Sequence, residues 1–185
     1  MTRQEIEAAF PLLAQHGFRI TSPAGDYNCF AWAARDTERW WEPRPGYFWP
    51  PGVPMQVTLA SFMQAYASVG FVPCPDGTVE PGFEKIAIYV DPLGSPKHAA
   101  RQLLFGKWTS KLGKQEDIKH HLDGLTGLRY GHVAQFMKRP QASLVSRVIP
   151  WLARLWLRWT FFLASLRTAL LFQGTAALFR QRLSS

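Results

Sequence analysis

Hydrophobic positions in the first part of the chain recur three or four residues apart, which is the spacing of amphipathic helices. Residues 4–15 follow this pattern and predict a short helix despite Pro11. A helix of roughly three turns is expected to begin at Asn28-Cys29, because asparagine is a favoured N-cap. Residues 58–70 predict a further helix, which starts at a threonine cap and stops at a glycine.

The later part of the chain changes to an alternation of apolar and polar positions, which is typical of β-strands. Candidate strands cover residues 85–91, 95–105, 106–113 and 130–138, while residues 116–125 place apolar side chains on one helical face. Helices therefore come first and hairpin-linked strands follow. This order predicts an α+β domain whose N-terminal helices pack on an antiparallel sheet.

Positive charge is concentrated near the C-terminus of this 185-residue chain, whose formal net charge is +8. Residues 1–138 contain 14 Lys and Arg against 13 Asp and Glu, whereas residues 139–185 contain seven Arg and no acidic residue. A phosphate-binding surface over the whole chain is not supported, so we do not expect nucleic acid to be a partner. The charge pattern predicts a nearly neutral domain at 1–138 and a basic helical tail at 139–185.

The tail is apolar as well as basic. On a helix, Arg147, Arg154, Arg158 and Arg180 fall on one side, and Trp, Phe and Leu side chains spread over the other. Arginines recur too often for a conventional membrane span. We expect residues 144–180 to form an amphipathic helix that contacts either a membrane surface or a protein partner.

Cys29 and Cys74 are the two cysteines, which are too few for a disulfide framework. The N-terminus has no apolar stretch of the kind found in signal peptides, so we expect a cytoplasmic protein, peripheral on a membrane where the tail meets lipid. The adjacent His120 and His121 would diverge on a helix, and no metal-ligand spacing occurs. We therefore expect neither a metal ion nor another cofactor.

Cys29 is the candidate nucleophile of the chain. In the first turn of a helix, a cysteine lies at the positive end of the helix dipole, which favours the thiolate. His98, at the start of a predicted strand, is the candidate base that would complete an activated thiol. The alternative interpretation is a buried structural thiol and an ordinary strand-end histidine.

The run Tyr27-Asn28-Cys29 at a helix start, followed by a sheet whose second strand begins with His98, resembles the papain-like cysteine hydrolases, and among them the NlpC-type amidases and peptidases. The resemblance covers about residues 20–138. It implies a papain-like fold and a thiol hydrolase, such as a cysteine protease, or an acyl transferase acting on an amide or peptide bond. The backbone N–H of Cys29 and a neighbouring donor would then bind the oxyanion.

In that family a third polar residue, on the strand after the histidine, holds the imidazole in one tautomer. Pairing the strands around Phe105-Gly106 matches Ser110 to this position. Serine departs from the usual His, Asn or Asp and cannot balance an imidazolium charge, so Asp117 is the alternative orienting residue. The departure also supports a second hypothesis: a catalytically degenerate papain-like module that binds a partner and is held to a membrane or multi-protein assembly by its C-terminal helix.

Residues 40–54 contain five prolines and five aromatic residues and predict a rigid surface loop. Aromatic and polar side chains near the nucleophile could wall a substrate groove; they are Tyr27, Asn28, Trp40, Trp41 and Trp49. The alternative is that the aromatic cluster packs on itself, because proline-stiffened aromatics bury area at little entropic cost.

Overall fold

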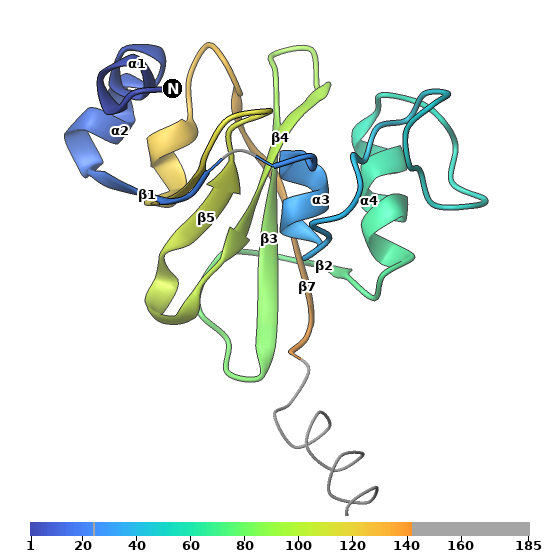
Figure 1. Cartoon of the computed structure of the whole chain (residues 1–185). Coiled ribbons are helices and arrows are strands. Elements are labelled where there is room, and N and C mark those ends of the chain that lie inside the picture. Colours follow the sequence, from blue (N-terminus) through green and yellow to red (C-terminus); the bar gives the residue numbers. More distant parts are fainter. Residues whose placement is uncertain (24, 142–185) are drawn as a thin grey trace, which may run out of the picture. The chain divides into compact units, whose positions relative to one another are not determined.

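The computed structural model describes residues 1–23 and 25–141, in which one sheet has the strand order β1-β6-β5-β4-β3-β7-β2 (Figure 1). All neighbouring strands pair antiparallel. The strands are β1 (Phe18–Ser22), β2 (Val72–Cys74), β3 (Phe83–Val90), β4 (Pro96–Gln102), β5 (Trp108–Lys111), β6 (Asp117–His120) and β7 (His132–Pro140). Long β3 carries β4 on one side and β7 on the other, so the middle of the sheet holds the start of β4 and with it His98.

Residues 1–23 and 25–141 contain four short α-helices beside the sheet: α1 (Arg3–Ala9), α2 (Pro11–His16), α3 (Cys29–Ala33) and α4 (Leu59–Ala67). The single helix predicted over residues 4–15 is two helices, because Pro11 occupies the first position of α2 and the chain turns at Phe10. The predicted start of α4 is confirmed, since the Thr58 side chain accepts a hydrogen bond from the Ser61 amide.

The papain-like α+β fold predicted from the sequence is wrong. The described residues are mostly β-structure, and their few short helices do not pack on the sheet as helices do in a papain-like fold. The helix at Cys29 has five residues rather than three turns, because Arg35 adopts a left-handed φ of 67° and a proline-rich loop follows.

Residues 116–125, predicted as a helix, form β6 and the 3-10 turn η2 (Leu122–Leu125). Their apolar spacing fits a helix, but β6 pairs with both β1 and β5 and is buried between them. Tertiary pairing outweighs the local pattern there. The sequence pattern also did not reveal β1 or β2. The predicted turn at Phe105-Gly106 forms the 3-10 turn η1 (Leu104–Gly106).

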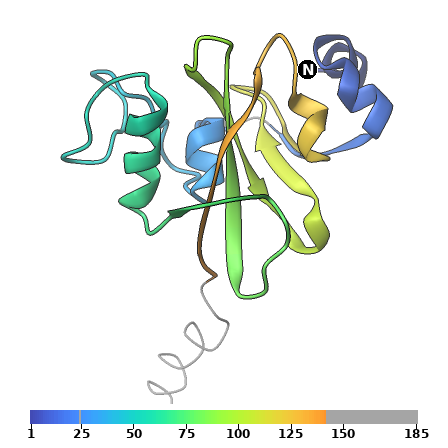
Figure 2. The same cartoon turned by 180° about the vertical axis from the view of Figure 1, so that it is seen from behind.

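Strand alternation divides the core between the two faces of the sheet. The α3 face carries a cluster that includes Cys29, Phe30, Phe62, Tyr66, Ile86, Ile88 and Ala99. The opposite face carries a cluster that includes Ile6, Leu13, Ala87, Tyr89, Ala100, Trp108 and Ile118. In Figure 2, which shows the molecule from behind, α1 and α2 lie near the β1 end of the sheet and α4 lies toward the β2 end.

β7 continues beyond Lys138, so Arg139 and Pro140 belong to the first compact unit, which spans Met1–Gln141. The Arg139 guanidinium binds the buried Glu84 carboxylate, and it also donates to the carbonyl oxygens of Val69 and Ala34 at 3.0 and 3.1 Å. Arg139 therefore ties the end of the sheet to both α3 and α4.

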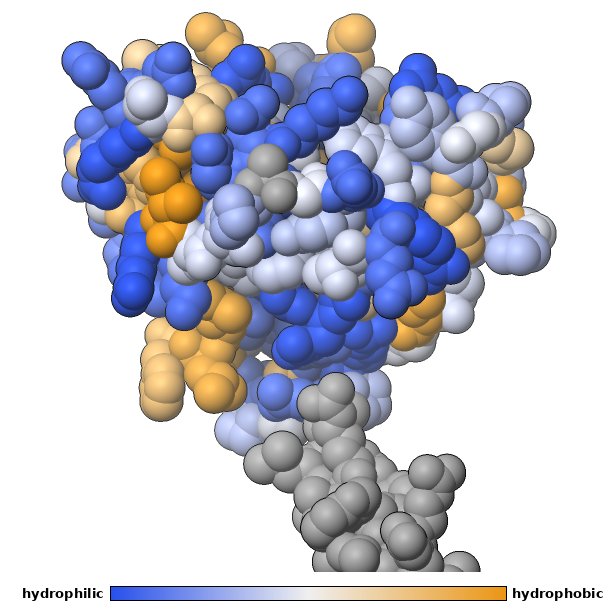
Figure 3. Space-filling view, in the orientation of Figure 1, coloured by the Kyte–Doolittle hydropathy of each residue, from blue (hydrophilic) through white to orange (hydrophobic). Residues whose placement is uncertain are grey.

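The predicted tail helix over residues 144–180 lies outside the described residues. Within residues 1–23 and 25–141, no helix has the length and apolar character needed to cross a membrane. Figure 3 shows hydrophobic residues on the surface in separate patches divided by hydrophilic ones. One patch lies over the turn that contains η1, where Leu104 and Phe105 are exposed.

Candidate functional site

Asn28 fixes the start of α3 and thereby the position of Cys29. Its side-chain oxygen accepts a hydrogen bond from the Ala31 amide at 3.0 Å, as an N-cap does. The same side chain donates to the Trp41 carbonyl at 2.7 Å and accepts from the Trp41 amide at 3.3 Å. Asn28 is 5% exposed, so its observed contacts join the helix start to the aromatic loop rather than line a groove.

The Cys29 sulfur is buried at the first position of α3, against β4. Burial raises the pKa of the thiol to about 12, while hydrogen bonds from the backbone of Ala99 and Phe30 lower it in part. The sequence led us to expect a helix terminus that favours thiolate, but the loss of hydration outweighs it. At neutral pH Cys29 is a protonated thiol, which needs a base to become a nucleophile.

His98 is fully buried, and its side chain shares a face with Tyr89, its partner across the β3–β4 pair. The Tyr130 ring stacks on the imidazole with centroids 4.1 Å apart and planes 9° apart. Among the residues that the structure describes, neither ring nitrogen of His98 has a hydrogen-bond partner, so no hydrogen bond joins it to Cys29. Burial, followed by the nearby His120, lowers the pKa of His98 well below its ordinary value, which keeps the ring neutral.

Ser110 lies next to His120 rather than bonding His98. The Ser110 hydroxyl is 2.8 Å from Nε2 of His120, and Nδ1 of His120 is 2.6 Å from the His121 carbonyl oxygen. Because a carbonyl only accepts, Nδ1 of His120 carries the proton, and the Ser110 hydroxyl donates to Nε2. Burial lowers the pKa of His120 to about 4, so this pair is neutral at physiological pH.

Asp117, the alternative orienting residue, lies on the α3 face with a different partner. The Tyr27 hydroxyl donates to one carboxylate oxygen of Asp117 at 2.6 Å, and the other oxygen has no hydrogen-bond partner within residues 1–23 and 25–141. Burial raises the pKa of Asp117, while Tyr27 and Lys111 lower it in part. Tyr27 is 8% exposed and stacks on Trp32, so its contacts in this structure are internal.

The aromatic loop divides into a packed part and an open part. Trp41 and Trp49 are 2% and 9% exposed and belong to the α3-face cluster. Trp40 lies at the surface, where it and Tyr47 line a cavity of about 550 Å³ together with Asp26. Of the five groove candidates, Trp40 is the one that lines this cavity.

Sequence reasoning missed Tyr130 and Lys111. The Tyr130 ring covers His98, but it follows in a loop after η2 and carries no motif. Lys111 is fully buried on the short strand β5, and its charge offsets in part the raised pKa of the buried Cys29 thiol, but no sequence motif singles it out. In the described part of the chain, no three His, Cys, Asp or Glu side chains gather as a metal site.

A family model described as a domain of unknown function (DUF7689) matches residues 19–138 of the chain. No curated protein matches. No solved structure matches either.

Proposed function

This chain belongs to the family of the domain of unknown function DUF7689, whose description names no activity, and we propose from its residues that it is a thiol hydrolase or acyl transferase acting on amide or peptide bonds. Cys29 is the nucleophile in this proposal and His98 is its base. Because the fold is not papain-like, the proposal rests on the two side chains and their surroundings.

One observation carries the proposal: β4, the strand that contacts the Cys29 thiol, also bears the buried His98, and neither ring nitrogen of His98 has a hydrogen-bond partner among the described residues. His98 directly precedes Ala99, whose backbone donates to the Cys29 sulfur. An unpaired buried polar group costs free energy, and such groups call for an explanation such as catalysis. Hydrogen bonds of catalytic groups are often long or absent before substrate binds.

The reaction proceeds from neutral partners. As the Cys29 sulfur attacks the carbonyl carbon, His98 takes the thiol proton, and the carbonyl oxygen becomes an oxyanion that the Cys29 backbone N–H binds. The imidazolium gives its proton to the leaving amine, and the C–N bond breaks to leave a thioester. Water, or an acceptor amine or hydroxyl, then attacks the thioester, and Cys29 recovers its proton through His98.

The proposal requires the start of β4 to move when substrate binds, because the His98 side chain must leave Tyr130 and the opposite face of the sheet to reach the thiol. Burial keeps the His98 imidazole neutral, but its lowered pKa also makes it a weaker base, so it takes the thiol proton only after it has left its buried position. Tyr130 would then act as a positioning residue that holds the resting ring. Ser110 has no part in this mechanism, since its hydroxyl donates to His120.

The test is acyl transfer from p-nitrophenyl acetate to the full chain. We expect a burst of p-nitrophenol and an acetyl group on Cys29, located by peptide mass spectrometry. Cys29→Ala should lose the burst, with Cys74→Ala as the matched control. His98→Gln should slow acetylation by about a hundredfold or more, whereas the exposed His132→Gln should not. Equal acetylation of Cys29 and Cys74, or no effect of His98→Gln, would contradict the proposal.

The high pKa of Cys29 favours a second candidate, a binding module without catalysis. In that case the open side of the aromatic loop, with Trp40 and Tyr47, binds the partner, and the apolar basic tail provides attachment to a membrane or assembly. The acetylation experiment separates the two candidates, because the binding module predicts no burst and no acetyl group on Cys29.

A further inference from the structure

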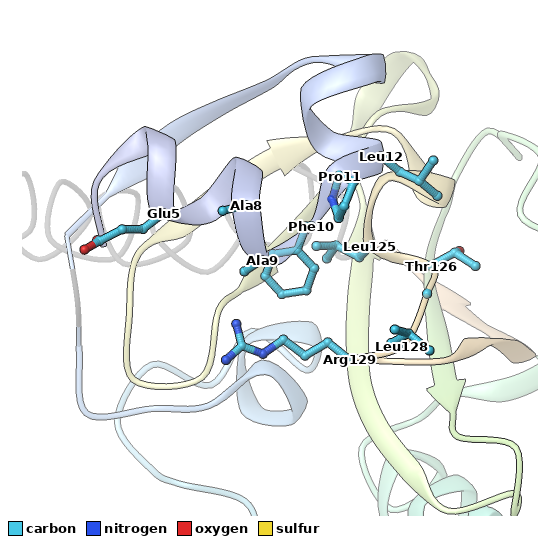
Figure 4. Close-up of a pocket in the computed structure, with 11 residues that line it drawn as sticks. Glu5, Ala8, Ala9, Phe10, Pro11, Leu12, Leu125, Thr126, Leu128 and Arg129 are labelled. Carbon is cyan, nitrogen blue, oxygen red and sulfur yellow. The ribbon is translucent and has the colours of Figure 1, made fainter.

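An apolar groove of about 890 Å³ lies between the α1–α2 pair and the loop that follows η2 (Figure 4). Its helix side includes Ala8, Phe10 and Leu12, and its loop side includes Leu125, Leu128 and Arg129. This volume falls in the range of small-molecule sites, which are mostly apolar with a few placed polar groups. The groove does not include Cys29, and the inference drawn from it does not rest on the proposed function.

The loop side of the groove is held in one conformation. The Gly127 and Gly131 backbones exchange hydrogen bonds of 2.8 and 2.7 Å, which closes a tight turn over the three residues between them. Gly131 has a φ of 76°, and a Cβ there would lie 1.7 Å from the Val90 carbonyl oxygen, so only glycine fits. The fold therefore fixes Leu128 and Arg129 beside the groove before any ligand arrives.

Leu128 is exposed to solvent over its whole surface at the tip of this turn. A scattered exposed leucine needs no explanation, but this one adjoins an apolar groove and is fixed by backbone hydrogen bonds. An aliphatic chain lying in the groove would remove both surfaces from water.

Arg129 supplies the charge of the groove. Its guanidinium lies over the Phe10 ring, 5.6 Å from the centroid, and it forms no salt bridge with any described residue. The acidic residue at the other end, Glu5, accepts a hydrogen bond from the Thr2 amide at 2.7 Å as part of the α1 capping box. The positive charge of Arg129 is thus available to a ligand. A hydrogen bond from the Thr2 amide does not remove the negative charge of a carboxylate, so an anionic head group is expected at the Arg129 end of the groove, away from Glu5.

We propose that this groove binds a long-chain carboxylate, with the aliphatic chain against Phe10, Leu12 and Leu125 and the carboxylate on the Arg129 guanidinium. An arginine fork matches a carboxylate in a bidentate geometry. The apolar walls fit an unbranched hydrocarbon chain, which needs no hydrogen-bond donors or acceptors.

The test is isothermal titration of the full chain with dodecanoate, kept below the concentration at which it forms micelles. We expect one dodecanoate per chain. Butyrate, which keeps the carboxylate and lacks the long chain, and dodecyltrimethylammonium, which keeps the chain and reverses the charge, should each bind at least tenfold more weakly. Dodecyl phosphate tests the head group, and binding tighter than dodecanoate would overturn the assignment of a carboxylate.

Three variants separate the groove from the basic tail. Arg129→Gln should weaken dodecanoate binding about ten- to a hundredfold, because a charge-assisted contact is lost. Ala8→Trp, at an exposed position on the groove wall, should fill the groove and abolish binding without affecting the core. Arg158→Gln in the tail is the matched control and should bind normally. Unchanged binding by both groove variants, or loss of binding in Arg158→Gln, would overturn the proposal.

Discussion

The two faces of the sheet bury polar side chains in different ways. The α3 face pairs charges with one another: the buried Glu84 carboxylate binds Arg139 and the half-exposed Arg35. The opposite face, where β4, β5 and β6 meet, buries neutral groups instead: His98, and Ser110 bonded to His120. The charges of the first face must stay paired, whereas the imidazoles of the second must stay unprotonated.

The difference matters for chemistry because Cys29 and His98 belong to different faces. The thiol packs in the α3-face cluster, and the imidazole packs against Tyr89 and Tyr130. A catalytic pair assembled from these residues needs a movement at the start of β4. That strand pairs with β3 through a register shift between Tyr89 and Val90, close to His98, where the ladder is irregular.

The largest expected effect concerns the α3 face, which we call the charged face because it holds Glu84 and its arginines. Arg139→Ala should lower the free energy of unfolding by about 3–5 kcal/mol, because it leaves Glu84 buried with one arginine instead of two. Urea denaturation measures this, and Arg44→Ala at an exposed position is the control. A loss below about 1 kcal/mol would show that Arg35 alone compensates Glu84. A chain that ends after Lys138 should lose the same interaction, whereas one that ends after Gln141 should keep it.

Acid should first affect the opposite face of the sheet, which we call the neutral face because its buried histidines are unprotonated. His120 has a pKa of about 4 in the folded chain, below its ordinary value of about 6.5, so the unfolded chain binds more protons between these values. The stability that depends on a neutral His120 ring is fully present above a pH of about 6.5. It is lost as the pH falls toward about 4, which lowers the free energy of unfolding by about 3 kcal/mol. Burial lowers the pKa of His98 in the same direction and adds to the loss.

Urea denaturation across this pH range measures the effect. His120→Gln should be less sensitive to acid than the natural chain, while His132→Gln should match it, because His132 is exposed. If His120→Gln and the natural chain lose stability in parallel, the buried imidazole is not the source of the acid sensitivity.

The helix starts of this molecule follow from local sequence, whereas the register of its strands does not. Local signals identified the starts of α3 and α4, because N-caps act on residues nearby. The sequence matches Ser110 to His98, but the register pairs Arg101 with Thr109, so Ser110 falls opposite Ala100, two residues short of His98. Its partner, His120, lies on a strand whose apolar spacing fits a helix. The register between the consecutive strands β4, β5 and β6 therefore decides the neutral face, and the pattern within one strand does not give the register of the next.

Smaller losses of stability are expected when a single hydrogen bond is removed from either face. Ser110→Ala should cost about 1–3 kcal/mol, because it leaves Nε2 of His120 buried without a partner. Tyr27→Phe should cost a similar or larger amount on the charged face, because both oxygens of Asp117 would then lack a hydrogen bond. Thermal unfolding of the two variants beside Thr37→Ala, at an exposed position outside these networks, provides the comparison. No loss in Ser110→Ala would mean that the Ser110–His120 hydrogen bond does not form in solution.

The most direct test of the account is a crystal structure of the chain after iodoacetamide has alkylated Cys29, because the adduct places an amide group at the proposed reaction centre. The account predicts that the His98 ring has left Tyr130 and that one of its nitrogens lies about 2.6–3.2 Å from the sulfur or the amide of the adduct. A structure in which His98 remains stacked on Tyr130, with both nitrogens still lacking partners beside an alkylated Cys29, would contradict the proposed catalytic pair.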